Sequence, residues 1–372
     1  MDDPNQAPWY VLTDVVTIDT PAFVVYPERV KANIRAIRQW VDPARLRPHV
    51  KTHKLREVAV LQMDEGITRF KCATIAEAEM LGLVGAPDVL LAYQPVGPKI
   101  SRLLSLVQGY PQTRFSCLVD HPAAARTIAA AAADRGLNLP VFIDLNVGMN
   151  RTGILPGADA LDLYEQCNSL TGVQAVGLHV YDGHIRQADA AERAAACREA
   201  FMPVLEMKEE LIRRGYRPTV VAGGSTTFLW HAEQPDVECS PGTFVYWDAG
   251  YEQLLPDQGF HSAAVVVTRV VSLPSDRLVC CDLGHKSVAA ENEVTNRVVL
   301  LNAPDLKVVS QSEEHLVLEA PAGHSYGIGD VLYGVPVHVC PTAALYEQAL
   351  VAEDGTITGA WRTLARDRAI SL

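Results

Sequence analysis

The sequence predicts an α/β protein in which a (β/α)8 TIM barrel is followed by an antiparallel β-domain. Through the first two thirds of the chain, short apolar strands alternate with helical patterns, as in βα units. These strands lack the polar and apolar alternation of a half-exposed sheet, which favours parallel strands covered on both faces. After about Phe260, short strands joined by turns replace this pattern. A doubly wound open sheet is the competing arrangement, because counting strands separates the two folds poorly.

The barrel is expected at residues 20–258, with eight strand and helix units. Its first strand is Ala22–Tyr26, and an apolar residue every three or four positions from Val30 to Val41 predicts the helix that follows. The other seven strands are separated by helical stretches rich in Ala, Leu and Glu. They are expected at Arg47–Lys51, Arg69–Cys72, Val89–Ala92, Phe115–Val119, Val141–Asp144, Ala175–Val180 and Thr219–Ala222.

The β-domain is expected at residues 1–19 and 259–372. Six short strands bounded by turn residues indicate it. They are Ala263–Val271, Arg277–Cys281, Arg297–Leu301, Leu306–Val309, His315–Glu319 and Val331–Val335. No low-complexity linker separates the two domains, so we expect them to pack against each other.

The amino-acid composition excludes several classes of partner and site. The chain has 372 residues, 48% hydrophobic and 20% charged, with a net charge of -12, which disfavours nucleic acid and anionic membranes as partners. No apolar run approaches the roughly twenty residues of a membrane span, and the acidic start is unlike a signal peptide, so a cytoplasmic protein is expected. The eight cysteines are scattered, without the spacing of a disulfide scaffold or a structural zinc cluster.

The segment Arg47-Pro48-His49-Val50-Lys51-Thr52-His53-Lys54 predicts a reactive amine. Lys51 lies where an apolar strand ends, and neighbouring cations lower the pKa of a lysine and free its amine. Such a lysine could form an imine with pyridoxal 5'-phosphate. The alternative, which the segment taken alone favours, is a solvated basic turn.

A phosphate site is expected at Gly223-Gly224-Ser225-Thr226-Thr227, which directly follows a predicted late strand. The glycines let backbone amides approach an anion, the hydroxyls donate further hydrogen bonds, and barrels often bind phosphate late in the chain. A cofactor with an aldehyde and a phosphate needs both this loop and Lys51. A plain glycine turn is the alternative.

Two further strand ends carry polar side chains. Arg151, in Asn146-Val147-Gly148-Met149-Asn150-Arg151-Thr152-Gly153, could donate to the phenolate oxygen of the cofactor. In Tyr181-Asp182-Gly183-His184, the ring of Tyr181 could contact the cofactor and His184 could act as an acid or base. A surface arginine and a structural histidine are the alternatives.

A metal site is expected at His338-Val339-Cys340, on what the sequence predicts to be an extended strand. Residues two apart on a strand point to the same side, so the imidazole and the thiol could grip one divalent cation. Two ligands are too few for a closed zinc site, but they suit an open catalytic one. A buried cysteine beside an unrelated histidine is the alternative.

Together, RPHVKTHK, NVGMNRTG, YDGHI, AGGSTTF and HVCPT, with Asp19-Thr20-Pro21 near the start, resemble the metal-activated D-threonine aldolase and D-serine dehydratase family. The resemblance spans about residues 19 to 345 and implies a fold-type III pyridoxal phosphate enzyme with an alanine racemase-like barrel, usually a homodimer. It implies that Lys51 carries the cofactor and that Gly223, Gly224, Ser225 and Thr226 hold its phosphate. Arg151 would approach the phenolic oxygen, Tyr181 would lie at the cofactor, and His338 with Cys340 would bind Mn, Mg, Zn or Co.

The leading hypothesis is retro-aldol cleavage of a D-3-hydroxy amino acid such as D-threonine into glycine and an aldehyde, with His53 or His184 as the base. The rival is a dehydratase that releases ammonia and a 2-keto acid from the same substrates. An alanine racemase would leave His338 and Cys340 unexplained, and a non-catalytic cofactor carrier would leave the whole β-domain unexplained. Around Met149 and Asp182 this chain departs from the usual motifs of the family's aldolases. The choice of reaction therefore stays open.

Overall fold

The computed structural model describes residues 7–372, and the chain divides into two compact units. We call the first the barrel unit, which comprises residues 35–51, 56–242 and 367–372. The second, the sheet unit, comprises the residues up to Ile34 together with 52–55 and 243–366. This grouping differs from the domain ranges expected from the sequence, because the first predicted barrel strand and the stretch 243–258 both lie with the sheet unit.

The barrel unit is built on a parallel sheet in the order β2-β3-β4-β5-β6-β7-β8. Most of its strand residues are buried, as expected for strands covered on both faces. The strands are β2 (Arg69–Cys72), β3 (Asp88–Leu91), β4 (Arg114–Val119), β5 (Leu139–Leu145), β6 (Val173–Val180), β7 (Thr219–Ala222) and β8 (Val237–Cys239).

A segment with little regular structure closes this sheet into a barrel. Leu46 makes a parallel bridge to Cys239 in β8, and His49 makes one to Lys71 in β2. Arg47 anchors the segment, since its guanidinium is buried and paired with Asp88 and Glu238. The expected barrel is therefore confirmed over the open sheet, although residues 47–51 end in the 3-10 turn Val50–Thr52 rather than forming a full strand.

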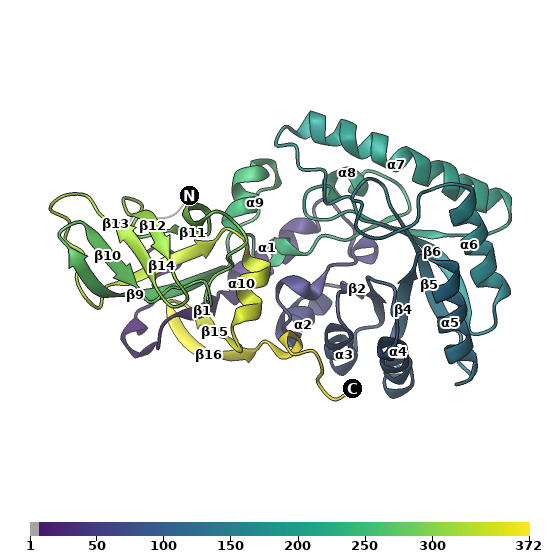
Figure 1. Cartoon of the computed structure of the whole chain (residues 1–372), viewed down its shortest axis with the longest axis horizontal. Helices are drawn as coiled ribbons and strands as arrows, with labels where there is room; N and C mark the ends of the chain where they lie inside the picture. Colours follow the sequence, from purple (N-terminus) through teal and green to yellow (C-terminus); the bar gives the residue numbers. More distant parts are fainter. Residues whose placement is uncertain (1–6) are drawn as a thin grey trace. The chain divides into compact units, whose positions relative to one another are not determined.

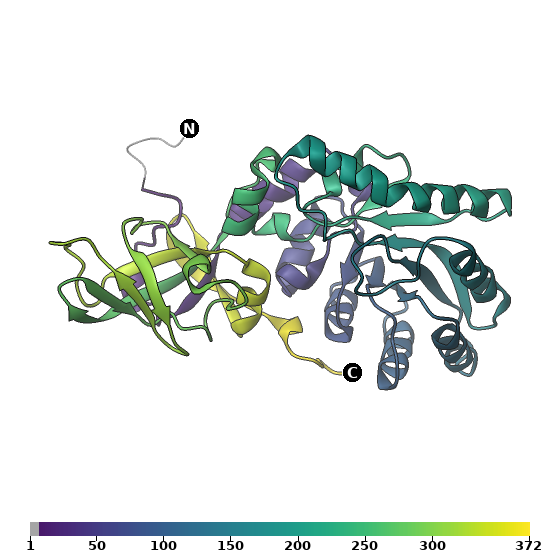
Figure 2. The ribbon, with the colours of Figure 1, turned by 45° about the horizontal axis from the view of Figure 1, so that its top comes forward.

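Helices cover the outside of the parallel sheet, as both ribbon views show (Figures 1 and 2). They are α2 (Arg56–Asp64), α3 (Ile75–Leu83), α4 (Pro98–Gly109), α5 (Pro122–Ala133), α6 (Ala158–Ser169), α7 (Ala190–Arg213) and α8 (Phe228–Ala232). In the described part of the chain, no helix has the length and apolar character required to cross a membrane.

The expectation that Ala22–Tyr26 is the first barrel strand is wrong. The structure places it as β1 (Ala22–Val25) in the sheet unit, antiparallel to β9 and parallel to β15. All four residues are buried, so the sequence pattern is the same as that of a barrel strand. The true last strand, β8, has three residues and was too short to be recognised.

The sheet unit contains a nine-stranded sheet whose main path is β12-β13-β10-β9-β1-β15-β16, with β14 joining β9 to β11. The six predicted strands are present, and β15 and β16 were not foreseen. Besides β1, the strands are β9 (Ala264–Ser275), β10 (Leu278–Cys281), β11 (Val298–Leu300), β12 (Lys307–Gln311), β13 (Leu316–Glu319), β14 (Val331–Pro336), β15 (Gln348–Glu353) and β16 (Thr356–Arg362). The helices are α1 (Pro27–Ile37), which continues into the barrel unit, α9 (Ala249–Leu254) and α10 (Val339–Leu345).

Candidate functional site

The ring of Tyr181, directly after β6, is the centre of the candidate cofactor site. The Lys51 Nζ lies 5.9 Å from the ring centroid, and the guanidinium carbon of Arg151 lies 4.8 Å from it. Gly224 packs against the ring, since an added Cβ there would lie 3.1 Å from Tyr181 Cε2. The barrel thus brings together an amine, a guanidinium and the glycine loop that the sequence predicted separately.

The glycine and hydroxyl loop has the build of an anion cradle. Gly223 has φ +81°, and a Cβ there would meet the ring of His231 at 2.8 Å, so the bare backbone is required. Ser225 and Thr226 are 7% and 4% exposed, which keeps their hydroxyls away from bulk water. The backbone amide of Gly224 donates to Thr227 Oγ1 at 3.2 Å.

Asp182 supports this loop from the end of β6. Its carboxylate accepts from Thr227 Oγ1 and from His231 Nε2, both at 2.7 Å. Although burial opposes ionisation, the His231 imidazole and the Thr227 hydroxyl hold the pKa of Asp182 below its ordinary value. The sequence identified this aspartate only as part of a motif, and its partners 45 and 49 residues away were not predictable.

Arg151 is held in place by a tight loop after β5. The Asn146 Oδ1 accepts from the amides of Gly148 and Asn150 at 3.1 Å each, and Asn150 has φ +53°. Gly153 has φ +99°, and a Cβ there would lie 2.6 Å from the Asn146 nitrogen. These constraints fix the loop that presents the Arg151 side chain toward Tyr181.

Sequence reasoning missed a buried chain of polar groups beneath Tyr181. Lys71, on β2, is 2% exposed, and its Nζ lies 5.8 Å from the Tyr181 centroid and 3.5 Å from His179 Nε2. The His179 Nδ1 lies 2.7 Å from Asp144 Oδ1. A lysine inside the apolar strand Arg69–Cys72 was the signal that could have identified this chain.

The pKa values of this chain follow from its burial. Burial, and then the Lys51 ammonium, lower the pKa of Lys71 to about 7, although Asp144 opposes the shift. Burial also lowers the pKa of His179, against the pull of Asp144. For Asp144 burial favours the neutral acid, but the hydrogen bond from His179 holds its pKa below the ordinary value.

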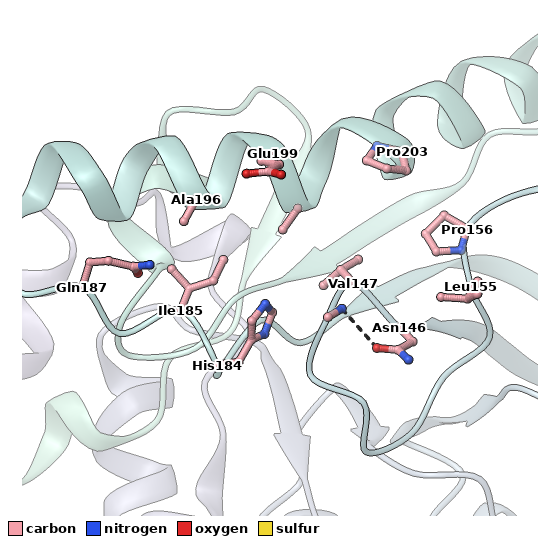
Figure 3. Close-up of a pocket in the computed structure, with 12 residues that line it drawn as sticks. Asn146, Val147, Leu155, Pro156, His184, Ile185, Gln187, Ala196, Glu199 and Pro203 are labelled. Carbon is pink, nitrogen blue, oxygen red and sulfur yellow. Dashed lines mark hydrogen bonds between the residues drawn. The ribbon is translucent and has the colours of Figure 1, made fainter.

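His184 lies apart from the Tyr181 ring contacts, at a cavity of about 570 Å³. The close-up shows its imidazole between the Asn146–Val147 loop and helix α7, with Glu199 on the helix (Figure 3). An added Cβ at Gly148 would meet His184 Nε2 at 2.7 Å. His184 therefore borders the loop that carries Arg151.

His53 lies in the sheet unit and is 1% exposed. Its Nδ1 accepts the Leu55 amide at 3.1 Å, and its ring packs edge-on against Tyr246, with 6.5 Å between centroids. Burial lowers the pKa of His53 to about 3. Burial and these contacts favour the neutral form of the His53 imidazole.

His338 and Cys340 lie at the start of α10, so the expectation of an extended strand there is wrong. Val339 is the first helical residue, and its amide donates to Asp248 Oδ2 at 3.0 Å. The Cys340 Sγ lies 3.2 Å from Thr52 Oγ1 and 3.7 Å from Thr243 Oγ1. The His338 imidazole and the Cys340 thiol are nonetheless hydrogen bonded to each other at the start of the helix.

The donor set at His338 suits an open metal site. The Nδ1 of His338 is hydrogen bonded to the Glu291 carboxylate, and metal-binding histidines are usually oriented by such a partner on one ring nitrogen. Although burial opposes protonation, Cys340 and Glu291 raise the pKa of His338 to about 9. Among residues 7–372 no group of three or more His, Cys, Asp or Glu ligands occurs, so further positions would fall to water or substrate.

Comparison with known proteins identifies the family. Residues 25–249, more than half of the chain, match the family described as alanine racemase, N-terminal domain. The chain belongs to the alanine racemase N-terminal domain family. Residues 263–352 match a second family, described as a putative serine dehydratase domain. The two matches follow the order of the barrel and the β-domain expected from the sequence.

The relatives that match this member of the alanine racemase N-terminal domain family over most of its length include aldolases and dehydratases, which are lyases. A D-threonine aldolase from Arthrobacter is 29% identical over 357 residues, covering 94% of this chain and 93% of that protein. A D-threo-3-hydroxyaspartate dehydratase from Delftia is 26% identical over 385 residues, covering 92% and 97%. The predicted family and class of enzyme, a pyridoxal phosphate-dependent lyase, are therefore confirmed.

Solved structures agree with this assignment to the alanine racemase N-terminal domain family. The D-threonine aldolase from Filomicrobium marinum has a TM-score of 0.86 at 28% identity, covering 94% of this chain and 96% of that one. A cysteine-to-alanine variant of a D-threo-3-hydroxyaspartate dehydratase, solved in the metal-free form, has a TM-score of 0.81 at 25% identity and covers 94% and 98%. In a second variant of that dehydratase a histidine two residues before that cysteine is replaced by alanine.

The residues around Tyr181 fit the cofactor of this family. Pyridoxal phosphate needs an amine for its aldehyde and donors for its phosphate, and both surround this one ring. The cradle at Gly223 and Gly224 has no room for side chains, and the hydroxyls of Ser225 and Thr226 belong to the same buried loop. We therefore take Lys51, Arg151 and the glycine loop as the candidate cofactor site.

Proposed function

We propose that the chain is a lyase that cleaves D-3-hydroxy amino acids, such as D-threonine, into glycine and an aldehyde. It would use pyridoxal phosphate on Lys51 and a divalent metal, Mn²⁺, Mg²⁺, Zn²⁺ or Co²⁺, on His338 and Cys340. The observation that carries the proposal is the grouping of Lys51, Arg151 and the glycine loop around the Tyr181 ring. The D-threonine aldolases among the relatives support the choice of reaction.

The barrel residues would bind and orient the cofactor. When bound, pyridoxal phosphate supplies an electron sink for the bonds to the α-carbon of an amino acid. Lys51 provides the amine that attaches it, and the amides and hydroxyls from Gly223 to Thr226 donate to its phosphate. The Arg151 guanidinium, 4.8 Å from the Tyr181 centroid, supplies positive charge on the same side of the barrel.

His338 and Cys340 would hold the metal, which supplies a Lewis acid for the substrate hydroxyl. Glu291 would fix the tautomer of His338 by accepting from Nδ1, which would make Nε2 the nitrogen for the cation. A base must take a proton during the reaction, and Lys51 and His184 are the proposed candidates. His53 is less suited to that role, since its Nδ1 already accepts the Leu55 amide inside the protein.

A second candidate function is dehydration of the same substrates to a 2-keto acid and ammonia. The D-threo-3-hydroxyaspartate dehydratase among the relatives supports it, and the histidine and cysteine replaced in two dehydratase variants are two residues apart, as are His338 and Cys340. One of those variants is in a metal-free form, which supports a metal role for such a cysteine in that enzyme.

Product analysis separates the two functions. Cofactor-loaded protein is given D-threonine, D-serine and D-3-hydroxyaspartate, with and without a chelator, and the products are identified. We expect glycine and an aldehyde, a loss of about 100-fold or more on metal removal, and the same loss in Cys340→Ala. Cys280→Ala, at a buried cysteine of the same unit, is the matched control and should retain activity and metal. Ammonia without glycine would establish the dehydratase instead, and activity indifferent to the chelator would remove His338 and Cys340 from the reaction.

A further inference from the structure

Asp182 lies between the two parts of the candidate cofactor site, the Tyr181 ring and the glycine loop. It directly follows Tyr181 in the chain and is buried. The backbone after it folds closely against the ring, since an added Cβ at Gly183 would lie 2.3 Å from the Tyr181 hydroxyl oxygen. The short segment from Tyr181 to Gly183 therefore has little freedom to move.

Three side chains connect this segment to the glycine loop, and we call Asp182, Thr227 and His231 the brace. The Asp182 carboxylate accepts from Thr227 Oγ1 and from His231 Nε2, both at 2.7 Å. The Thr227 hydroxyl oxygen in turn accepts the amide of Gly224 at 3.2 Å. On its other side Gly224 lies against the Tyr181 ring, so the loop is held from two directions.

Packing fixes the imidazole of the brace in one orientation. His231 is fully buried, and its ring packs edge-on against Phe201 and Trp230, with 4.9 Å and 5.0 Å between centroids. Within residues 7–372 no group is hydrogen bonded to the buried Nδ1 of His231. A proton on Nδ1 would therefore be a buried donor without an acceptor, whereas a proton on Nε2 is donated to Asp182.

The brace matters because the loop it holds contains two consecutive glycines. Glycine loses more conformational freedom on ordering than any other residue. A loop that is already ordered before an anion arrives does not lose this entropy on binding, so it binds more tightly than a mobile one. A carboxylate close to an anion site would by itself weaken binding through repulsion, so charge and ordering have opposite effects at Asp182.

Resting on the proposed cofactor role of the loop from Gly223 to Thr226, we propose that Asp182 is a positioning residue for the cofactor phosphate, and that the brace gives the chain its preference for pyridoxal 5'-phosphate over pyridoxal. Asp182 acts through the Thr227 hydroxyl on the Gly224 backbone. The loop is thereby kept in the shape that accepts a phosphate monoester. Pyridoxal has no phosphate and gains nothing from this ordering.

The test measures the affinity of the full chain, freed of cofactor, for pyridoxal 5'-phosphate and for pyridoxal, each followed by the absorbance of the bound aldehyde. We expect the wild type to prefer pyridoxal 5'-phosphate by about 100-fold or more, as two charge-assisted hydrogen bonds would give. Asp182→Asn should lower this ratio by about tenfold or more, through weaker binding of pyridoxal 5'-phosphate alone. An unchanged ratio would overturn the proposal, and so would a higher one, which loss of the negative charge alone would produce.

Asp182→Asn is a suitable probe because the volume of the side chain hardly changes. Its amide can still accept from the Thr227 hydroxyl, but its N–H group then meets the N–H group of His231 Nε2, so one arm of the brace is lost. Asp282→Asn is the matched control in the sheet unit, since that carboxylate accepts from the hydroxyls of Thr20 and Thr268 at 2.6 Å and 2.5 Å. It should leave the ratio unchanged.

A second pair of variants tests the link at Thr227, which keeps the proposal testable if Asp182→Asn does not fold. Thr227→Val removes the hydroxyl and should lower the ratio by about tenfold or more, whereas Thr227→Ser retains the hydroxyl and should keep the ratio near that of the wild type. Equal ratios in Thr227→Val and Thr227→Ser would overturn the proposal.

Failure of the cofactor assignment would give a different result. If the wild type binds pyridoxal as tightly as pyridoxal 5'-phosphate, the loop is not the phosphate site and the proposed function loses that part. If the wild type prefers pyridoxal 5'-phosphate and both Asp182→Asn and Thr227→Val keep the full preference, the phosphate site stands and only the brace is refuted.

Discussion

At the residue scale, identical residue types have unlike environments that decide what each can do. His53 is buried and accepts an amide hydrogen, His179 is held by Asp144, and His338 is hydrogen bonded to Glu291. The sequence indicated that some histidine near Lys51 could act as a base, but burial and partners come from residues distant along the chain. Lys71 is the converse case, since its chemistry depends entirely on partners that the strand pattern did not reveal.

The buried state of His53 predicts a dependence of stability on pH. The pKa of His53 is lowered from 6.5 to about 3 in the folded chain. Between these two pH values the unfolded state therefore binds a proton that the folded state does not bind. The contribution to stability is present above pH 6.5 and is lost as the pH falls toward 3, at about 1.4 kcal/mol per pH unit. Thermal unfolding between pH 7 and pH 4 checks this.

The variant His53→Gln removes the titrating group. Its Tm should fall less steeply with decreasing pH than that of the wild type, so the two curves converge in acid. His121→Gln, at an exposed histidine, serves as the control and should run parallel to the wild type. If His53→Gln also runs parallel to the wild type, His53 does not stay neutral in the folded chain.

At the scale of elements, the loop after β5 is so tightly packed that adding one methyl group at Gly153 should destabilise the protein measurably. At Gly153, φ is +99° and an added Cβ would lie 2.6 Å from the Asn146 nitrogen, a backbone atom that cannot move aside freely. Gly153→Ala should lower the free energy of unfolding by about 1–3 kcal/mol and weaken pyridoxal phosphate binding, since the loop presents Arg151.

Gly215 offers a matched comparison for that loop. Its φ of +92° is nearly the same, but an added Cβ would meet nothing within 4 Å. Gly215→Ala should therefore cost only the conformational term, about 1 kcal/mol, without affecting cofactor binding. Urea unfolding and a cofactor titration of both variants give the comparison, and equal effects on binding would mean that the loop does not position Arg151.

The elements also show which part of the fold the sequence could reveal. Barrel strands β2 to β7 were predictable, because buried parallel strands are short apolar runs between helices. Strand β1 was assigned to the wrong sheet, since burial on both faces gives the same pattern in either one. Helix α10 was missed because its first amide is satisfied by Asp248, 91 residues earlier.

At the scale of the whole molecule, the two units carry different parts of the proposed chemistry. The barrel unit holds Lys51, Arg151 and the glycine loop, and the sheet unit holds His338 and Cys340. The motifs, in order and spread over most of the chain, identified the family that the comparisons confirm. The sequence could not distinguish an aldolase from a dehydratase, because both reactions place a hydroxyl near a metal and an amino group on the cofactor. The homodimer implied by the family resemblance stays a prediction, and sedimentation of the protein would test it.

The central claim is that Lys51 is the lysine that carries pyridoxal phosphate. Borohydride reduction of the cofactor-loaded protein fixes the cofactor covalently to whichever lysine holds it, and mass spectrometry of the digested chain then locates the pyridoxyl group. We predict that the group is found on Lys51, at about one per chain. A pyridoxyl group on Lys54 or Lys71, or on no lysine of the chain, would contradict the account.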